Sequence, residues 1–160
     1  DPVPRYDIVI LDAFTSDYIP FHLMTREFLE EVKGILDDDG VVVANVFYSN
    51  KLFDAEFRTF GEVFGRCDAF LGAYSGNAML VSPGGAVPAL TAQELSERAA
   101  ALQAKHLFAF DLRQVAARFR PGLQPDPQAK VLTDDRAPVN WLRTQPTEML
   151  QGELVHPAQP

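Results

Sequence analysis

The sequence has 160 residues, a length that fits one domain and excludes two full ones. Its 47% hydrophobic and 22% charged residues exclude a disordered chain. A net charge of −8 repels phosphate backbones, so we expect no nucleic-acid partner. The single Cys67 has no disulfide partner, and the sequence contains neither a long apolar span nor a secretory signal, so we expect a cytoplasmic protein.

The first 47 residues predict a strand, a helix and a second strand. Residues 6–11 are a β-branched apolar run, which is typical of a strand buried on both faces. Thr25 can cap a helix, and a turn at residues 37–40 is expected to end it before an apolar strand at 41–47. Strands in this order pair in parallel through a right-handed crossover. The helix is predicted from the spacing of Phe28, Leu29, Val32, Ile35 and Leu36.

A second helix and a hairpin follow. The helix is expected to begin near Asp54, and its phenylalanines have the spacing of a face that packs into the core. Residues 70–74 and 78–82 predict two antiparallel strands, because Ser75, Gly76 and Asn77 between them have turn chemistry. The predicted order is therefore βαβαββ. The helical stripe consists of Phe53, Phe57, Phe60 and Phe64.

The last third of the chain predicts helices and loops. Thr91 and Glu94 form a capping box that opens a helix running to about Ala104, and another helix is expected over 112–118. A proline-rich loop at 120–128 follows, and residues 155–160 are expected to be a disordered tail. We therefore interpret residues 1–160 as one domain.

The glycine-rich turn that opens a doubly wound nucleotide-binding sheet is absent. Its absence disfavours an NAD-dependent oxidoreductase. Because the chain starts almost on a strand, we interpret it as the C-terminal half of a larger α/β domain. A small complete domain with an atypical sheet is the alternative.

Polar residues follow the first predicted strand, at the edge where ligands bind in open α/β sheets. Asp12 ends the strand, and Asp17 and His22 lie in the loop after it. The alternative reading makes Asp12 a cap and Asp17 a solvated turn residue. His22 could carry protons or, more commonly before a helix, be a structural group. His106 and His156 are far from other ligand types, so we predict no metal site.

Five segments, in this order, resemble the spermidine synthase family, the polyamine aminopropyltransferases. They span most of residues 5–142, and the resemblance is to a divergent bacterial branch of the family. It implies a Rossmann-like, methyltransferase-type fold, of which this chain is the C-terminal portion. The segments are residues 6–14 (YDIVILDAF), 19–28 (IPFHLMTREF), Asp39-Gly40-Val41 with Asn45, Tyr74-Ser75-Gly76, and 132–139 (LTDDRAPV).

The resemblance also implies a reaction and a site. Family members transfer an aminopropyl group from decarboxylated S-adenosylmethionine to a small cationic amine such as putrescine. Asp12 would act on the acceptor amine as catalytic base, while Asp17, Tyr74, Asn45 and His22 would bind the substrate. No metal is implied.

Alternatives stay open at this point. A methyltransferase that uses S-adenosylmethionine shares the fold, and a non-catalytic binding module is kept open because Asp12 and Asp17 are five residues apart rather than the family's three. Because we interpret the chain as the C-terminal half of a domain, we expect the isolated chain to be inactive. An exposed sheet edge makes a homodimer a further expectation. Two interpretations remain for Asp134, Asp135 and Arg136: an exposed run of charges, or a segment that closes over the cleft.

Overall fold

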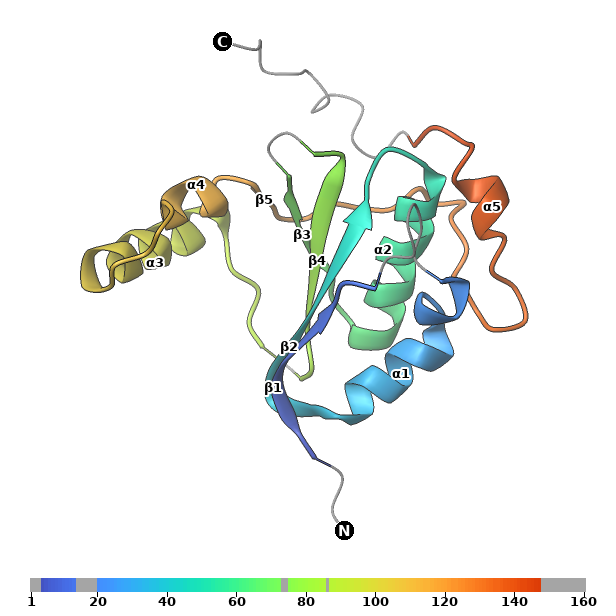
Figure 1. The fold of residues 1–160 in the computed structure, drawn as a ribbon, viewed down its shortest axis with the longest axis horizontal. Helices are drawn as coiled ribbons and strands as arrows, with labels where there is room; N and C mark the ends of the chain where they lie inside the picture. Colours follow the sequence, from blue (N-terminus) through green and yellow to red (C-terminus); the bar gives the residue numbers. More distant parts are fainter. Residues whose placement is uncertain (1–3, 14–19, 73–74, 86, 148–160) are drawn as a thin grey trace.

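Five strands form one mixed sheet in the order β1-β2-β4-β3-β5, with two helices against one of its faces (Figure 1). The computed structural model describes residues 4–13, 20–72, 75–85 and 87–147. The strands are β1 (Tyr6–Leu11), β2 (Leu36–Phe47), β3 (Asp68–Leu71), β4 (Asn77–Pro83) and β5 (Phe119–Arg120). The helices are α1 (Arg26–Gly34), α2 (Lys51–Phe64), α3 (Ala92–Lys105), α4 (Leu112–Ala116), α5 (Val139–Leu142) and the short 3-10 helix η1 (Phe21–Leu23).

The strand pairing confirms the predicted βαβαββ order. β1 and β2 are parallel, with Leu11 opposite Ala44. β4 lies antiparallel between β2 and β3, so β3 runs in the same direction as β1 and β2. The short β5, which the sequence did not predict, pairs with β3. The carboxyl ends of β1 and β2 therefore meet at one edge of the sheet.

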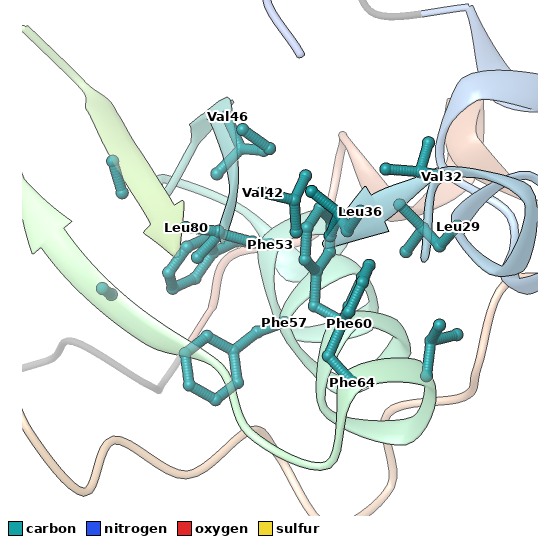
Figure 2. Packing of buried hydrophobic residues seen from close by; sticks show 14 of the residues in the cluster. Leu29, Val32, Leu36, Val42, Val46, Phe53, Phe57, Phe60, Phe64 and Leu80 are labelled. Carbon is teal, nitrogen blue, oxygen red and sulfur yellow. The ribbon is translucent and has the colours of Figure 1, made fainter. Parts of the chain in front are cut away.

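The phenylalanine stripe of α2 forms the centre of the core, as predicted (Figure 2). The four rings are at most 7% exposed, and they pack with inward-facing residues of β2 and β4 and with Leu29 and Val32 of α1. Burial of one such side chain stabilises the fold by about 2 kcal/mol. The stripe thus holds α2, and with it the sheet, in a fixed position.

The boundary between the first helix and the second strand differs from the prediction. α1 ends at Gly34, and Leu36 begins β2 as a buried core residue. Residues 37–40 are part of β2 and form no separate turn, because the β1–β2 register shifts between Tyr6 and Ile8 and absorbs the extra residues. Glycine at position 40 permits this close approach of β1 to β2, because an added Cβ would lie 2.7 Å from the carbonyl oxygen of Tyr6.

The prediction that β1 is buried on both faces is wrong. Tyr6, Ile8 and Ile10 are 48%, 60% and 69% exposed, whereas Val9 and Leu11, which point the other way, pack against the core. The physical reason is visible in Figure 1: α1 and α2 cover only one face of the sheet, and β1 is its edge strand. We call the uncovered side the open face.

The capping residues behave as the sequence predicts, with small shifts in helix length. Thr25 caps α1, and Thr91 with Glu94 forms the complete capping box of α3. α2 begins at Lys51 rather than near Asp54, because Asn50 caps it by accepting a hydrogen bond from Leu52 N. α3 and α4 pack together as a pair that stands away from the sheet (Figure 1). None of the described helices is both long and apolar enough to cross a membrane.

Candidate active site

A polar network lies where β1 and β2 end. Asn45 Nδ2 donates a hydrogen bond of 3.0 Å to Asp12 Oδ1, and Asn77 Nδ2 donates one of 2.8 Å to Asn45 Oδ1. The strand register explains the meeting: Leu11 pairs with Ala44, so the residues that follow them, Asp12 and Asn45, become neighbours. Because side chains alternate along a strand, these polar groups belong to the same open face as Ile10.

The network leaves part of Asp12 open to a ligand. Its Oδ1 is held by Asn45, while no hydrogen bond to its Oδ2 arises from the residues that the structure describes. The side chain is exposed at the sheet edge. An ionised carboxylate only accepts hydrogen bonds, so this oxygen is suited to a cationic donor such as an ammonium group.

The other predicted site residues are distributed differently. Asp17 and Tyr74 lie outside the described residues. His22 lies in η1 with its ring edge-on to Phe21, at 5.6 Å between centroids, and its carbonyl oxygen accepts a 3.4 Å hydrogen bond from Thr25 Oγ1. In the described part of the chain, no hydrogen bond joins His22 to Asp12 or Asn45. The structure therefore brings together Asp12 and Asn45 of the predicted set.

Two polar residues near this edge were not predicted. Asn77 was interpreted as a turn residue, and it is the first residue of β4. Glu56 lies on α2, is 3% exposed, and lines a cavity of about 50 Å³ on the helix side of the sheet. Burial raises the pKa of its carboxyl to about 8, so it is mainly protonated at neutral pH. The other lining residues are all apolar: Leu11, Ala13, Leu23, Met24, Phe28, Ala44, Val46 and Phe60.

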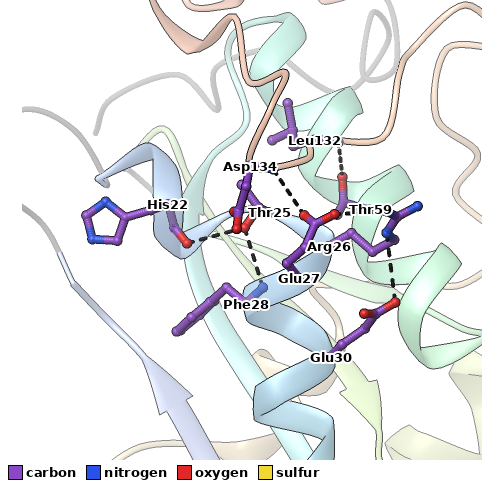
Figure 3. Close-up of polar contacts among 9 residues, drawn as sticks. All are labelled: His22, Thr25, Arg26, Glu27, Phe28, Glu30, Thr59, Leu132 and Asp134. Carbon is purple, nitrogen blue, oxygen red and sulfur yellow. Dashed lines mark hydrogen bonds and ion pairs between the residues drawn. The ribbon is translucent and has the colours of Figure 1, made fainter.

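The segment that carries Asp134 joins the start of α1 to α2 (Figure 3). Leu132 accepts a 2.8 Å hydrogen bond from Arg26 N through its carbonyl oxygen, and its own N–H donates one of 3.0 Å to Thr59 Oγ1. Asp134 N donates to Glu27 Oε2 at 3.1 Å. The segment thus fixes α1, the first α-helix after Asp12 in the chain, while the side chains of residues 134–136 are exposed. We call residues 132–134 the clasp.

Removing the buried hydroxyl of Thr59, which holds the clasp against α2, is expected to destabilise the protein. In Thr59→Val the N–H of Leu132, a residue 1% exposed, loses its acceptor, and an unpaired buried N–H costs about 1 to 3 kcal/mol. Urea denaturation of the intact protein measures the change in the free energy of unfolding. The control Thr144→Val removes an exposed hydroxyl and should change that free energy by less than about 0.5 kcal/mol. A loss as small in Thr59→Val as in the control would contradict this role.

The fold agrees with that of known proteins. Two solved structures share the fold: human methyltransferase-like protein 13 in complex with SAH, with a TM-score of 0.57, 24% identity, and coverage of 68% of this chain and 52% of that one; and a probable spermidine synthase from Corynebacterium glutamicum ATCC 13032, with a TM-score of 0.50, 21% identity, and coverage of 86% and 51%. The protein is therefore of the Rossmann-like, methyltransferase-type α/β class, as predicted.

The sequence comparison points to a family within that class. A polyamine aminopropyltransferase from Vibrio vulnificus (strain CMCP6) is 40% identical over 141 residues, which cover 87% of this chain and 46% of the relative. No family model matches the chain. Over most of its length the chain is similar to polyamine aminopropyltransferases, which supports a spermidine synthase-like family and confirms the resemblance seen in the sequence. It spans less than half the length of the curated relatives it matches.

Proposed function

We propose that this chain supplies the acceptor-binding half of an aminopropyltransferase. The observation that carries the proposal is the Asp12 carboxylate, held at one oxygen by Asn45 at the edge where β1 and β2 end. The name of the Vibrio vulnificus relative supports the same activity. The co-substrate would be decarboxylated S-adenosylmethionine, and the acceptor a small polyamine such as putrescine.

Asp12 would solve the main chemical difficulty of this reaction. An alkyl amine with a pKa of about 10.4 arrives protonated at neutral pH and has no lone pair for attack. Asp12 Oδ2 would bind the ammonium and accept or relay one proton. The nitrogen then attacks the carbon next to the sulfonium, so that a C–N bond forms, the C–S bond breaks and methylthioadenosine leaves. Asp17, Tyr74 and His22 would bind the acceptor amine.

The open face supports the proposal that further chain completes the domain. Tyr6, Ile8 and Ile10 form an exposed apolar row on an edge strand, and such surfaces pack against other chain segments in complete domains. We propose that the N-terminal half of the same domain packs there and carries the nucleoside site. A homodimer that uses this edge is the competing proposal.

The isolated chain of 160 residues is therefore expected not to bind methylthioadenosine, because the glycine-rich and ribose-binding parts are absent from it. Calorimetric titration of the isolated chain measures this directly. Heat changes that fit a dissociation constant in the micromolar range would contradict the expectation and place the nucleoside site within these residues.

Product analysis tests the activity. The intact protein is incubated with putrescine and either decarboxylated S-adenosylmethionine or S-adenosylmethionine, and the products are separated by mass. We expect spermidine and methylthioadenosine from the first mixture. Methylated amine from the second mixture would instead favour a methyltransferase, and no product from either would favour a binding module.

A further inference from the structure

Asn77 takes part in the network at the sheet edge although it does not contact Asp12. It is half-buried at the start of β4, and its Nδ2 lies 2.8 Å from Asn45 Oδ1. The next hydrogen bond in the series, from Asn45 Nδ2 to Asp12 Oδ1, is 3.0 Å long. Two amides are therefore arranged in sequence, with the carboxylate at one end.

This order of donors and acceptors is the one that the carboxylate requires. An ionised Asp12 can only accept, so Asn45 must turn its NH₂ group toward it and its carbonyl oxygen away. That carbonyl oxygen then needs a donor, and Asn77 Nδ2 provides it. If Asn45 were rotated by half a turn, its oxygen would face Asp12 and its NH₂ would face the NH₂ of Asn77, so both hydrogen bonds would be lost.

We propose that Asn77 is a positioning residue, which fixes the amide of Asn45 so that Asn45 holds one oxygen of Asp12 and leaves the other to the acceptor amine. The catalytic part of this inference rests on the proposed function, whereas the orientation of Asn45 does not. Asp12 is exposed, so water competes for its oxygens, and a fixed donor keeps the carboxylate in one rotamer. Preorganisation of this kind matters because small misplacement of a reacting group lowers rates strongly.

The orientation can be tested without any catalysis. The intact protein is labelled with ¹⁵N-asparagine, and solvent exchange of the Asn45 side-chain NH₂ is followed by NMR. Asn77→Asp, which keeps the shape but not the donor, and Asn77→Leu, which has neither donor nor acceptor, should each speed this exchange about tenfold, the equivalent of about one hydrogen bond. The control Asn140→Asp, on the exposed face of α5, should leave it unchanged. Unchanged exchange in both Asn77 variants would overturn the proposal.

The consequence for transfer is measured on the same variants. With Asn77→Leu we expect kcat/KM for putrescine to fall about tenfold, while KM for the nucleoside co-substrate stays at its parent value. Faster exchange with an unchanged kcat/KM would overturn the positioning role. Absence of transfer in the parent protein would contradict the proposed function alone, since the exchange measurement would still report the orientation of Asn45.

Discussion

Replacing Asp12 with asparagine is expected to lower aminopropyl transfer by the intact protein about 10²- to 10⁴-fold, the range for loss of a general base. Asparagine keeps the size of the side chain and can still accept a hydrogen bond from Asn45 Nδ2. It cannot carry the charge that binds the ammonium or accept its proton. The measurement is kcat/KM for putrescine, followed through spermidine formation at neutral pH.

The pH of the assay separates this role from a structural one. As the pH rises toward about 10, a growing fraction of the acceptor amine is already neutral and needs no base. The deficit of Asp12→Asn should therefore narrow with pH. The control Asp134→Asn, whose exposed side chain lies in the clasp, should keep the parent rate at each pH. A parent-like rate for Asp12→Asn at neutral pH would remove Asp12 from the mechanism.

Replacing Glu56 with glutamine is expected to make the protein more stable at pH 8 than the parent. Burial raises the pKa of Glu56 from its ordinary 4.5 to about 8 in the folded protein, because an ionised carboxylate is poorly solvated among the apolar residues of its cavity. Between these two values the unfolded chain ionises and the folded chain does not. The free energy of unfolding contributed by Glu56 is therefore complete below about pH 4.5 and falls as the pH rises toward 8.

The size of this effect follows from the width of the pH window. Relative to Glu56→Gln, the parent should lose on the order of 3 kcal/mol between pH 5 and pH 8. Denaturant unfolding of both proteins at the two pH values gives the difference, in which the other titrating groups cancel. The control Glu62→Gln changes an exposed residue of the same helix and should follow the parent. If parent and Glu56→Gln change in parallel with pH, Glu56 is not a buried neutral acid.

The pattern of the sequence was sufficient for most of the fold. The helices with caps at Thr25 and Thr91 and the phenylalanine stripe of α2 were predicted, because caps and helical spacing are local signals. The exposure of Ile8 and Ile10 was not, since a β-branched run is the same whether or not another layer covers it. The inclusion of residues 37–40 in β2 depends on the register with β1, which no local signal specifies.

The site could be predicted only in part for a similar reason. Asp12 follows a strand, so its position at the sheet edge could be inferred from the sequence, and Asn45 entered through the family resemblance. Asn77 was interpreted as a turn residue from its local chemistry. Its hydrogen bond to Asn45 could not be predicted, because it depends on the pairing of β4 with β2. Glu56 has one local sign of burial, since Phe60 lies four residues later on the same helical face. The first half of α2 is buried almost all around. This burial depends on the tertiary structure, so the local pattern of the sequence does not predict it.

The acceptor site itself can be observed in a crystal structure of the intact protein with putrescine and methylthioadenosine bound. Our account predicts that one terminal nitrogen of putrescine lies within hydrogen-bonding distance of Asp12 Oδ2, while Asn45 still donates to Oδ1. A diamine bound elsewhere, with the Asp12 carboxylate contacting only water, would contradict it.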